Sequence, residues 1–236
     1  MKLGIIGEMA IEIADLKEKM ADMVTHTRTG MEFYEGTLEG IAVVVVQCGV
    51  GKVNAAMCTQ VLCDVFQVTH VINTGVAGSL CAELDIGDLV ISEDAMYHDF
   101  DCHVINPNYR VGQVPGMSVL AYPADPALMT AALASAEEQN PGHNRIGRIA
   151  SGDQFICNKE QKSYIITHTG ALCTEMEGAA IAHTAWRNGV PFVVIRAISD
   201  KADDSAEMDY PTFELIAAHR CSAVTIGLMK QLVKGA

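Results

Sequence analysis

Residues 175–200 decide the fold of this chain, and they read EMEGAAIAHTAWRNGVPFVVIRAISD. The middle of the stretch is rich in alanine and ends in Asn188-Gly189, which is typical of a short helix stopped by a glycine. Residues 192–198 are almost all apolar, as expected of a strand covered on both faces. Residues 171–173 indicate another strand. The unit therefore predicts two parallel strands joined by a helix in a right-handed crossover.

Two carboxylates of this stretch are expected to meet at one edge of the sheet. Glu177 follows the first strand and Asp200 ends the second. Ligands of open α/β sheets bind outside the carboxyl ends of the strands, so both side chains would face one crevice. Each acid taken alone has an ordinary explanation, because a carboxylate after a strand often caps the next helix. Asp203, Asp204 and Glu207 offer a second explanation, a solvated acidic loop.

The length and composition predict one α/β domain over residues 1–236. Half of the residues are hydrophobic, which is enough for a sizeable core, and the formal net charge is −13. That charge does not suit nucleic acid or an anionic membrane, because a phosphate backbone requires a basic patch. No apolar run approaches the ~20 residues that a membrane span needs. We therefore expect neither nucleic acid nor a membrane as a partner.

Eight cysteines are scattered at positions 48, 58, 63, 81, 102, 157, 173 and 221. No two of them form a C-x-x-C pair, which argues against a zinc ribbon or a thioredoxin motif. Most lie in apolar surroundings and are expected to be small buried side chains in a reducing compartment. Lys2 and the apolar run after it are too short for a secretory signal. We expect a cytoplasmic protein that uses neither a metal nor a cofactor.

The rest of the chain alternates between strands and helices, without repeats or linkers. A first strand over residues 2–6 is followed by a helix from about Glu8 to Met23, because apolar residues recur there at helical spacing. Asp125-Pro126 is typical of a helix start, and Pro211 is expected to open the last helix. The other predicted strands cover residues 31–34, 41–48, 70–74, 89–92 and 144–150, and the predicted helices cover 53–67, 126–139, 159–167 and 211–233.

Several loops carry candidate binding groups. Glu12 lies just beyond the first strand and is a third carboxylate for the crevice, although the helix dipole alone explains an acid there. Residues 49–52, Gly-Val-Gly-Lys, allow a ligand to approach the backbone closely, but their spacing matches neither the dinucleotide fingerprint nor the Walker loop. Residues 75–79 are a second loop of small residues. Residues 97–115 are long for a connection, which is usual for functional or interface loops.

Together these motifs resemble those of the 5′-methylthioadenosine/S-adenosylhomocysteine nucleosidases, a family of the purine nucleoside phosphorylase superfamily. The matching stretches cover most of the chain, and the spacing of Glu-Met-Glu and Arg-Ala-Ile-Ser-Asp is specific. They are residues 2–7 with Glu12, 49–53, 73–78, 97–99, 151–153, 175–177 and 196–200. The resemblance implies a three-layer α/β/α fold with a central, mixed and twisted sheet, and a role in methionine salvage.

The resemblance also implies a role for each site residue. Asp200 would protonate the purine at N7, Glu12 would hold and deprotonate the attacking water, and Glu177 would accept hydrogen bonds from the ribose hydroxyls. The remaining substrate-binding residues would be Met176 against the sugar, Phe155 on adenine, the Ile156 main chain on the base edge, Val50 and Tyr210 near the 5′-thio group, Arg196 ordering the water and Glu12, and Val76, Ala77, Gly78, Glu175, Ser199 and Tyr109 around them.

The residue types agree with this chemistry. Cleavage of an N-glycosidic bond builds positive charge on the ribose and negative charge on the purine, so an acid must neutralise the base while carboxylates stabilise the sugar. Asp200 must be protonated when it acts, so its pKa is expected to be raised. The resemblance further implies that the 97–115 loop, with Tyr109 and Pro115, reaches the site of a neighbouring subunit, so we expect a homodimer.

Two features depart from the family pattern. Val76 stands where many relatives carry serine, which removes one polar contact near the ribose or the water. The loop between Asp101 and Gly112 is longer than the common pattern and lacks its aromatic pair. Of the properties that the resemblance implies, the preference for a 5′ substituent is the one that these departures affect most.

Three other functions compete with hydrolysis of these nucleosides. A nucleoside phosphorylase would need arginines for phosphate, but Glu8, Glu12 and Asn73 stand at the strand ends, and carboxylates repel phosphate. A purine-nucleoside hydrolase of the futalosine type is an alternative. A non-catalytic binding protein on this fold would be expected to lose the acid or the water base, and Glu12, Glu177 and Asp200 are all present.

Overall fold

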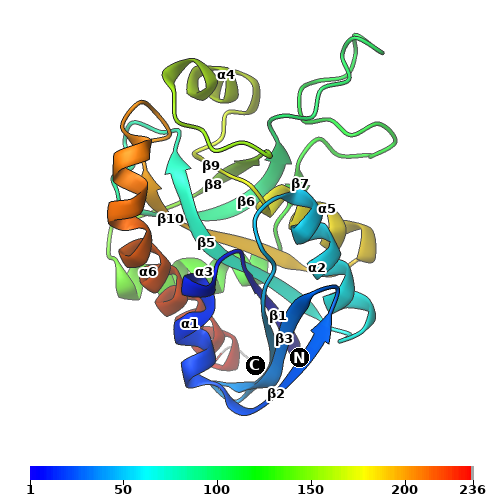
Figure 1. Ribbon diagram of the computed structural model, residues 1–236, viewed down its shortest axis with the longest axis vertical. Coiled ribbons are helices and arrows are strands. Elements are labelled where there is room, and N and C mark those ends of the chain that lie inside the picture. Colours follow the sequence, from blue (N-terminus) through cyan, green and yellow to red (C-terminus); the bar gives the residue numbers. More distant parts are fainter. Residues whose placement is uncertain (235–236) are drawn as a thin grey trace.

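Ten strands form one mixed sheet in the computed structural model, which describes residues 1–234 (Figure 1). The strands are β1 (Lys2–Gly7), β2 (Ala21–Arg28), β3 (Met31–Leu38), β4 (Ile41–Gln47), β5 (His70–Ser79), β6 (Leu89–Tyr97), β7 (Tyr122–Pro123), β8 (Asn144–Ser151), β9 (Cys173–Glu175) and β10 (Phe192–Asp200). The helices are α1 (Ala10–Lys19), α2 (Lys52–Asp64), α3 (Pro126–Gln139), α4 (Lys159–Thr169), α5 (Gly178–Asn188) and α6 (Ala206–Lys234).

Helices cover both faces of the sheet because the central strands are apolar on both sides. In β4, Val44 and Val46 pack into one core with residues of α2 and α5. Val43 and Val45 point the other way and pack into a second core with residues of α1, α3 and α6. Successive side chains of a strand alternate between faces, so this run of valines needs a helical layer on each side. The expected α/β/α architecture with a mixed central sheet is confirmed (Figure 1).

Part of the sheet closes on itself, which the sequence did not predict. The strand order is β10-β6-β8-β9-β5-β1-β4-β3-β2, and β5 also pairs with β10. The strands β5, β10, β6, β8 and β9 therefore form a ring, while β1 to β4 extend from it as an open sheet. Closure satisfies the backbone groups that an open edge would leave unpaired.

The strand–helix–strand unit of residues 171–200 is present, but its predicted parallel pairing is wrong. β9 pairs with β5 in the antiparallel sense and β10 pairs with β5 in the parallel sense. β9 and β10 consequently run in opposite directions, on opposite edges of β5. The prediction failed because strand direction depends on partners that are distant in the sequence.

β1 and β9 share one edge of β5 and point toward each other. β1 is parallel to β5 and covers this edge up to the pair Ile6–Asn73, whereas antiparallel β9 covers it at Gly78 and Ser79. Residues 74–77 of β5 lie between the two strand ends. The segments that follow β1 and β9 therefore meet here, which gives the site its place in the fold.

The predicted helix from Glu8 to Met23 is wrong at its C-terminal end. α1 stops at Lys19, and Met20 already has the extended backbone angles φ −71° and ψ 143°. The following residues form β2, an exposed edge strand that pairs with β3. Met20 and Met23 continued the helical spacing by chance, and the hydrogen bonds to β3 outweigh that local pattern.

The remaining elements agree with the sequence apart from some boundaries. Asp125 caps α3 by accepting hydrogen bonds from Ala127 and Leu128, at 3.0 and 2.9 Å, with Pro126 following as predicted. Residues 75–79, expected as a loop, continue strand β5. The last helix begins at Ala206, so Pro211 lies inside it rather than opening it. Among residues 1–234, no helix combines the length and apolar character that a membrane crossing would require.

Candidate active site

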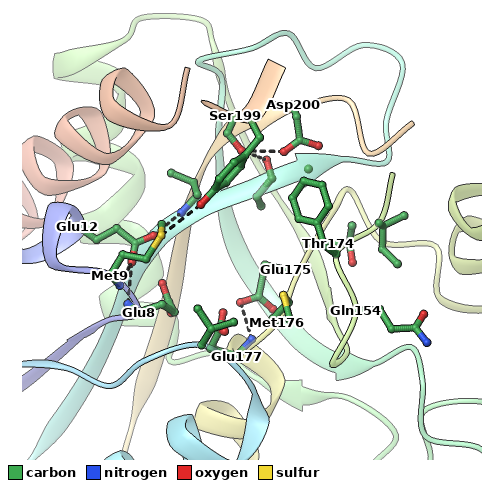
Figure 2. A pocket seen from close by; sticks show the side chains of 17 residues that line it. Glu8, Met9, Glu12, Gln154, Thr174, Glu175, Met176, Glu177, Ser199 and Asp200 are labelled. Carbon is green, nitrogen blue, oxygen red and sulfur yellow. Dashed lines mark hydrogen bonds between the residues drawn. The ribbon is translucent and has the colours of Figure 1, made fainter. Parts of the chain in front are cut away.

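A pocket opens where the segments after β1, β9 and β10 converge on the middle of β5 (Figure 2). Thirteen of the fifteen predicted site residues line it. The lining residues are Glu8, Met9, Glu12, Val50, Val76, Ala77, Gly78, Gln154, Phe155, Ile156, Thr174, Glu175, Met176, Glu177, Ser199, Asp200 and Tyr210. The two predicted residues outside this set are Arg196, which is fully buried behind the carboxylates, and Tyr109.

Four lining residues were not predicted as site residues: Glu8, Met9, Gln154 and Thr174. Glu8 follows the carboxyl end of β1, the same signal that pointed to Glu12. Met9 precedes the first helical residue, and its sulfur accepts a hydrogen bond from the Tyr210 hydroxyl at 3.2 Å. Gln154 and Thr174 have no sequence signal of their own, because tertiary packing alone brings them to the pocket.

Glu12 is held by the start of α1. Its Oε2 accepts hydrogen bonds from the main-chain N–H groups of Glu8 and Met9, at 2.7 and 2.8 Å, which is a helix-capping arrangement. Its Oε1 accepts one from the Val76 N–H at 3.2 Å. Burial, followed by the neighbouring Glu8 carboxylate, raises the pKa of Glu12 well above its usual range. A carboxylate with a raised pKa is a stronger base than an exposed one.

Arg196 is the cationic centre behind the pocket. Its Nη2 donates to Glu8 Oε1 at 3.0 Å, to Asn73 Oδ1 at 2.6 Å and to a Glu175 oxygen. The sequence predicted that Arg196 orders Glu12, but these hydrogen bonds go to Glu8 and Glu175 instead. Because the guanidinium is completely buried, its charge is balanced by these two acids and not by solvent.

Glu175 ends β9 and Glu177 lies two residues further on, and the two side chains have different partners. Glu175 accepts hydrogen bonds from Arg196, from the Ser151 hydroxyl and, at 2.8 Å, from the Gly178 N–H. Glu177 accepts one from the Gly51 N–H at 2.6 Å. Gly51 has φ +97°, a backbone conformation that favours glycine, so the Gly-Val-Gly-Lys loop serves to present this N–H.

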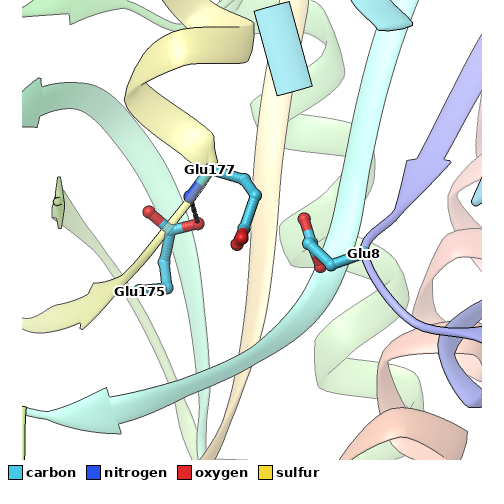
Figure 3. Close-up of side chains that lie close together, drawn as sticks. All are labelled: Glu8, Glu175 and Glu177. Carbon is cyan, nitrogen blue, oxygen red and sulfur yellow. Dashed lines mark hydrogen bonds between the residues drawn. The ribbon is translucent and has the colours of Figure 1, made fainter. Parts of the chain in front are cut away.

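Glu8, Glu175 and Glu177 are close enough to bind a cation, since each offers an oxygen within 4.8 Å of the others (Figure 3). The Arg196 guanidinium already supplies positive charge to two of them. Burial, followed by the charges of Glu8 and Glu175, raises the pKa of Glu177 to about 9. A proton on Glu177 therefore balances part of the remaining charge at neutral pH.

Asp200 lies apart from the glutamates, at the end of β10 (Figure 2). Its Oδ2 accepts a hydrogen bond from the Ser199 hydroxyl at 2.9 Å and its Oδ1 accepts one from the Ala202 N–H at 2.8 Å. The side chain is 2% exposed, and burial raises its pKa. A carboxyl group that retains its proton at higher pH is suited to donate it to a leaving group.

The mouth of the pocket is apolar and aromatic. Phe155 and Tyr210 meet edge to face, with ring centroids 5.5 Å apart. Phe155 and Val50 are 44% and 52% exposed, so both offer free apolar surface to a ligand. The pocket thus combines three features: a group of glutamates (Glu8, Glu12, Glu175 and Glu177), a buried acid at Asp200, and an aromatic entrance formed by Phe155 and Tyr210. This combination fits a ligand with a polar part and a flat apolar part.

Tyr109 lies outside this pocket, within the segment between β6 and β7 that extends away from the sheet (Figure 1). Two apolar residues of this segment, Val104 and Ile105, are 86% and 81% exposed. This segment contains nearly all of the 97–115 loop that the sequence predicted to be functional or part of an interface.

The chain is similar to known proteins over almost its whole length. A family model described as "Phosphorylase superfamily" matches residues 2–230. The 5′-methylthioadenosine/S-adenosylhomocysteine nucleosidase of Staphylococcus carnosus (strain TM300) is 40% identical over 231 residues, which cover 98% of this chain and 100% of that protein.

Two solved structures extend the comparison. The S-adenosylhomocysteine nucleosidase of Streptococcus pyogenes in complex with 5-methylthiotubericidin has a TM-score of 0.93 and 33% identity, covering 98% of this chain and 97% of that chain. The futalosine hydrolase of Helicobacter pylori strain 26695 has a TM-score of 0.92 and 32% identity, covering 98% and 97% of the two chains. The fold is thus shared by nucleosidases that differ in substrate.

Proposed function

The chain belongs to the phosphorylase superfamily, and from that premise we propose that it hydrolyses the N-glycosidic bond of 5′-methylthioadenosine and S-adenosylhomocysteine. The products are adenine and the corresponding 5-thioribose. This assignment rests on the nucleosidase relative, whose 40% identity exceeds the 32% of the futalosine hydrolase. It places the protein among the N-glycosyl hydrolases, and we further propose that it serves methionine salvage.

We propose that Asp200 is the general acid. As the bond between the purine and C1′ breaks, its electron pair moves to the purine, and Asp200 donates a proton to N7. Burial supports this role because it keeps the carboxyl group protonated to higher pH. The Ser199 hydroxyl donates a hydrogen bond to Oδ2 of Asp200 and so orients the Asp200 side chain.

Glu12 is proposed to accept the proton of the water that attacks C1′. Its raised pKa gives its ionised form the basicity that this step needs. Glu177 would accept hydrogen bonds from the ribose hydroxyls, and Met176 would pack on the sugar. The net negative charge of the glutamates around the ribose stabilises the positive charge that develops on the sugar.

The aromatic entrance is proposed to bind the base and the 5′ substituent. Phe155 would stack on adenine and the Ile156 main chain would bond its edge, while Val50 and Tyr210 would contact the 5′-thio group. Stacking of an aromatic side chain on a base contributes ~1–3 kcal/mol in single-strand binding proteins. Ala77 and Gly78 leave room for the ligand beside β5, since both line the pocket with little or no side chain.

The observation that favours water over phosphate as the nucleophile is that, within residues 1–234, no lysine, arginine or histidine lines the pocket. The nearest guanidinium, that of Arg196, is fully buried and paired with Glu8 and Glu175. A phosphate beside one carboxylate at ~4 Å would experience a repulsion of about 4 kcal/mol at an effective dielectric of ~20. A water molecule has no such penalty.

The test is to incubate the purified protein with 5′-methylthioadenosine, with and without excess phosphate, and to analyse both products. We expect adenine and free 5-methylthioribose at the same rate in both reactions. A rate that depends on phosphate, or formation of the sugar 1-phosphate, would contradict hydrolysis. Futalosine is run in parallel, and faster release of its base would reassign the substrate.

We also propose that the protein is a homodimer in the reducing cytoplasm. The exposed Val104 and Ile105 support an interface at the 97–115 loop, because exposed apolar surface marks sites of interaction with other proteins. Tyr109, which does not reach the pocket of its own chain, would then contact the partner's pocket. All eight cysteines are free thiols, which agrees with a reducing compartment.

A further inference from the structure

Glu8 occupies the centre of a buried polar network that neither the sequence motifs nor the proposed mechanism uses. Its Oε1 accepts hydrogen bonds from Asn73 Nδ2 at 2.6 Å and from Arg196 Nη2 at 3.0 Å. The side chain is only 5% exposed, yet it lines the pocket. Three adjacent strands, β1, β5 and β10, therefore fix the position of this one carboxylate.

Glu8 also contacts Glu12 in two ways. Its main-chain N–H donates to Glu12 Oε2 at 2.7 Å. Its side chain faces the same small space as the Glu12 side chain, because a methyl carbon added to Gly75 would touch both Glu8 Oε2 and Glu12 Oε1. Figure 2 shows the two carboxyl groups side by side at this end of the pocket.

We propose that Glu8 is a positioning residue for the hydrolytic step: it holds Glu12 through its main-chain N–H and keeps a negative charge beside Glu12 that strengthens Glu12 as a base toward water. The inference rests on the proposed function, in which Glu12 accepts a proton from water. Asn73 and Arg196 both donate to Oε1 of Glu8 and hold its carboxyl group in place beside Glu12.

Among the charged groups around Glu12, Glu8 has the largest effect on the pKa of Glu12, and a substitution can remove its charge. The titratable and charged groups that face it are Glu8 after β1, Arg196 on β10, Tyr210 and Cys221 on α6, and Cys48 after β4. Burial raises the pKa of the tyrosine and of both thiols, so these three groups are neutral at neutral pH. Arg196 opposes the effect of Glu8 on Glu12, and burial adds to it.

The experiment measures kcat and KM of Glu8→Gln from pH 4 to pH 9, after the unmodified protein has been shown to release adenine. The amide keeps the shape of the side chain and removes its charge. The acidic limb of the kcat profile, which reports ionisation of Glu12, should move to lower pH by about one unit or more. The kcat on the plateau should fall about tenfold because Glu12 becomes a weaker base. Glu8→Asp, which retains a charge, should keep the limb near its original pH.

Glu175→Gln is the matched control, because Glu175 also pairs with Arg196 but makes no hydrogen bond to Glu12. Its acidic limb should stay in place even if its turnover falls. Thermal unfolding checks that each variant folds, and Glu8→Ala replaces Glu8→Gln if the latter does not. An unshifted limb in the charge-free variant, or an equal shift in Glu175→Gln, would overturn the role of Glu8. Absence of adenine release from the unmodified protein would instead overturn the proposed function.

Discussion

Four buried glutamates surround a single buried guanidinium behind the pocket. Glu8, Glu12, Glu175 and Glu177 all act electrostatically on Arg196. One positive charge cannot balance four negative ones in a poorly solvated space, so some of the carboxyl groups retain protons. The pKa of Glu177, which is raised to about 9, expresses this. A ribose that acquires positive charge would balance part of the excess negative charge. Catalysis is therefore coupled to the protonation state of the site.

Asp200→Asn should retain ligand binding but lose turnover by about 10²–10⁴-fold, because an amide cannot donate a proton to N7. Adenine release and binding of a cationic ribose analogue are measured separately. Asp204→Asn is the control, since Asp204 is an exposed aspartate paired with Lys159. Turnover of Asp200→Asn close to that of the control would remove Asp200 from the acid role.

Glu177 should make the folded protein less stable as the pH rises. The folded state holds the Glu177 proton up to a pKa of about 9, whereas the unfolded chain releases it near 4.5. The folded state therefore binds more protons between these values, and the free energy of unfolding falls as pH rises through the window. Urea unfolding at pH 5, 7 and 9 should show a shallower decline for Glu177→Gln than for the unmodified protein and for the exposed-residue control Glu18→Gln. Parallel curves for all three proteins would contradict the raised pKa.

At the level of secondary structure elements, the site depends on two strands that meet head to head on one edge of β5. β1 delivers Glu8 and Glu12, and β9 delivers Glu175 and Glu177. Gly75 of β5 lies opposite their meeting point. A Cβ atom there would lie 2.7 Å from Glu12 Oε1 and 3.0 Å from Arg196 Nη1, and would overlap Glu8 Oε2. The absence of a side chain at this position is what allows the carboxylates to gather.

Gly75→Ala should therefore reduce activity far more than it reduces stability. Displacement of a catalytic group by about 1 Å can cost ~10²-fold in rate, so we expect a loss of that order in kcat/KM. Gly147→Ala on β8 is the matched control, because its added Cβ would contact the Leu172 side chain, away from the pocket. That variant should lose stability and keep its activity. Equal activity of the two variants would show that the carboxylates tolerate a side chain at Gly75.

Across the whole molecule, a closed ring of strands and two helical layers hold the site, while one long segment extends from them (Figure 1). The ten strands belong to one sheet. The segment between β6 and β7 instead exposes the apolar side chains of Val104 and Ile105. An interface with a second copy of the chain would cover this exposed apolar surface.

Ile105→Asp should therefore shift the protein from dimer to monomer and lower its activity, since a charge would be buried in the proposed interface. Sedimentation velocity at micromolar concentration gives the oligomeric state, and adenine release gives the activity. Val24→Asp on β2, at the opposite end of the molecule, introduces the same charge on an exposed valine and should leave the dimer intact (Figure 1). A fully active monomer of the unmodified protein would contradict the dimer.

The sequence alone determined those features that depend on neighbouring residues. The cap at Asp125, the glycine after α5 and the apolar run of β10 are local signals, and each marked its element correctly. The rule that ligands bind where strands end, together with the family resemblance, brought most of the pocket residues together in advance. Both sources work without knowledge of which strands pair.

Tertiary structure decided whatever depends on pairing between distant segments. The direction of β9, the closure of β5 with β10 and the edge strand β2 follow from hydrogen bonds to strands far away in the sequence. The partners of Arg196 and the place of Glu8 follow from the same pairings. Local sequence encodes the propensity of a segment to extend or to coil, but the partner that satisfies its backbone and buries its charges is chosen only when the whole chain is packed.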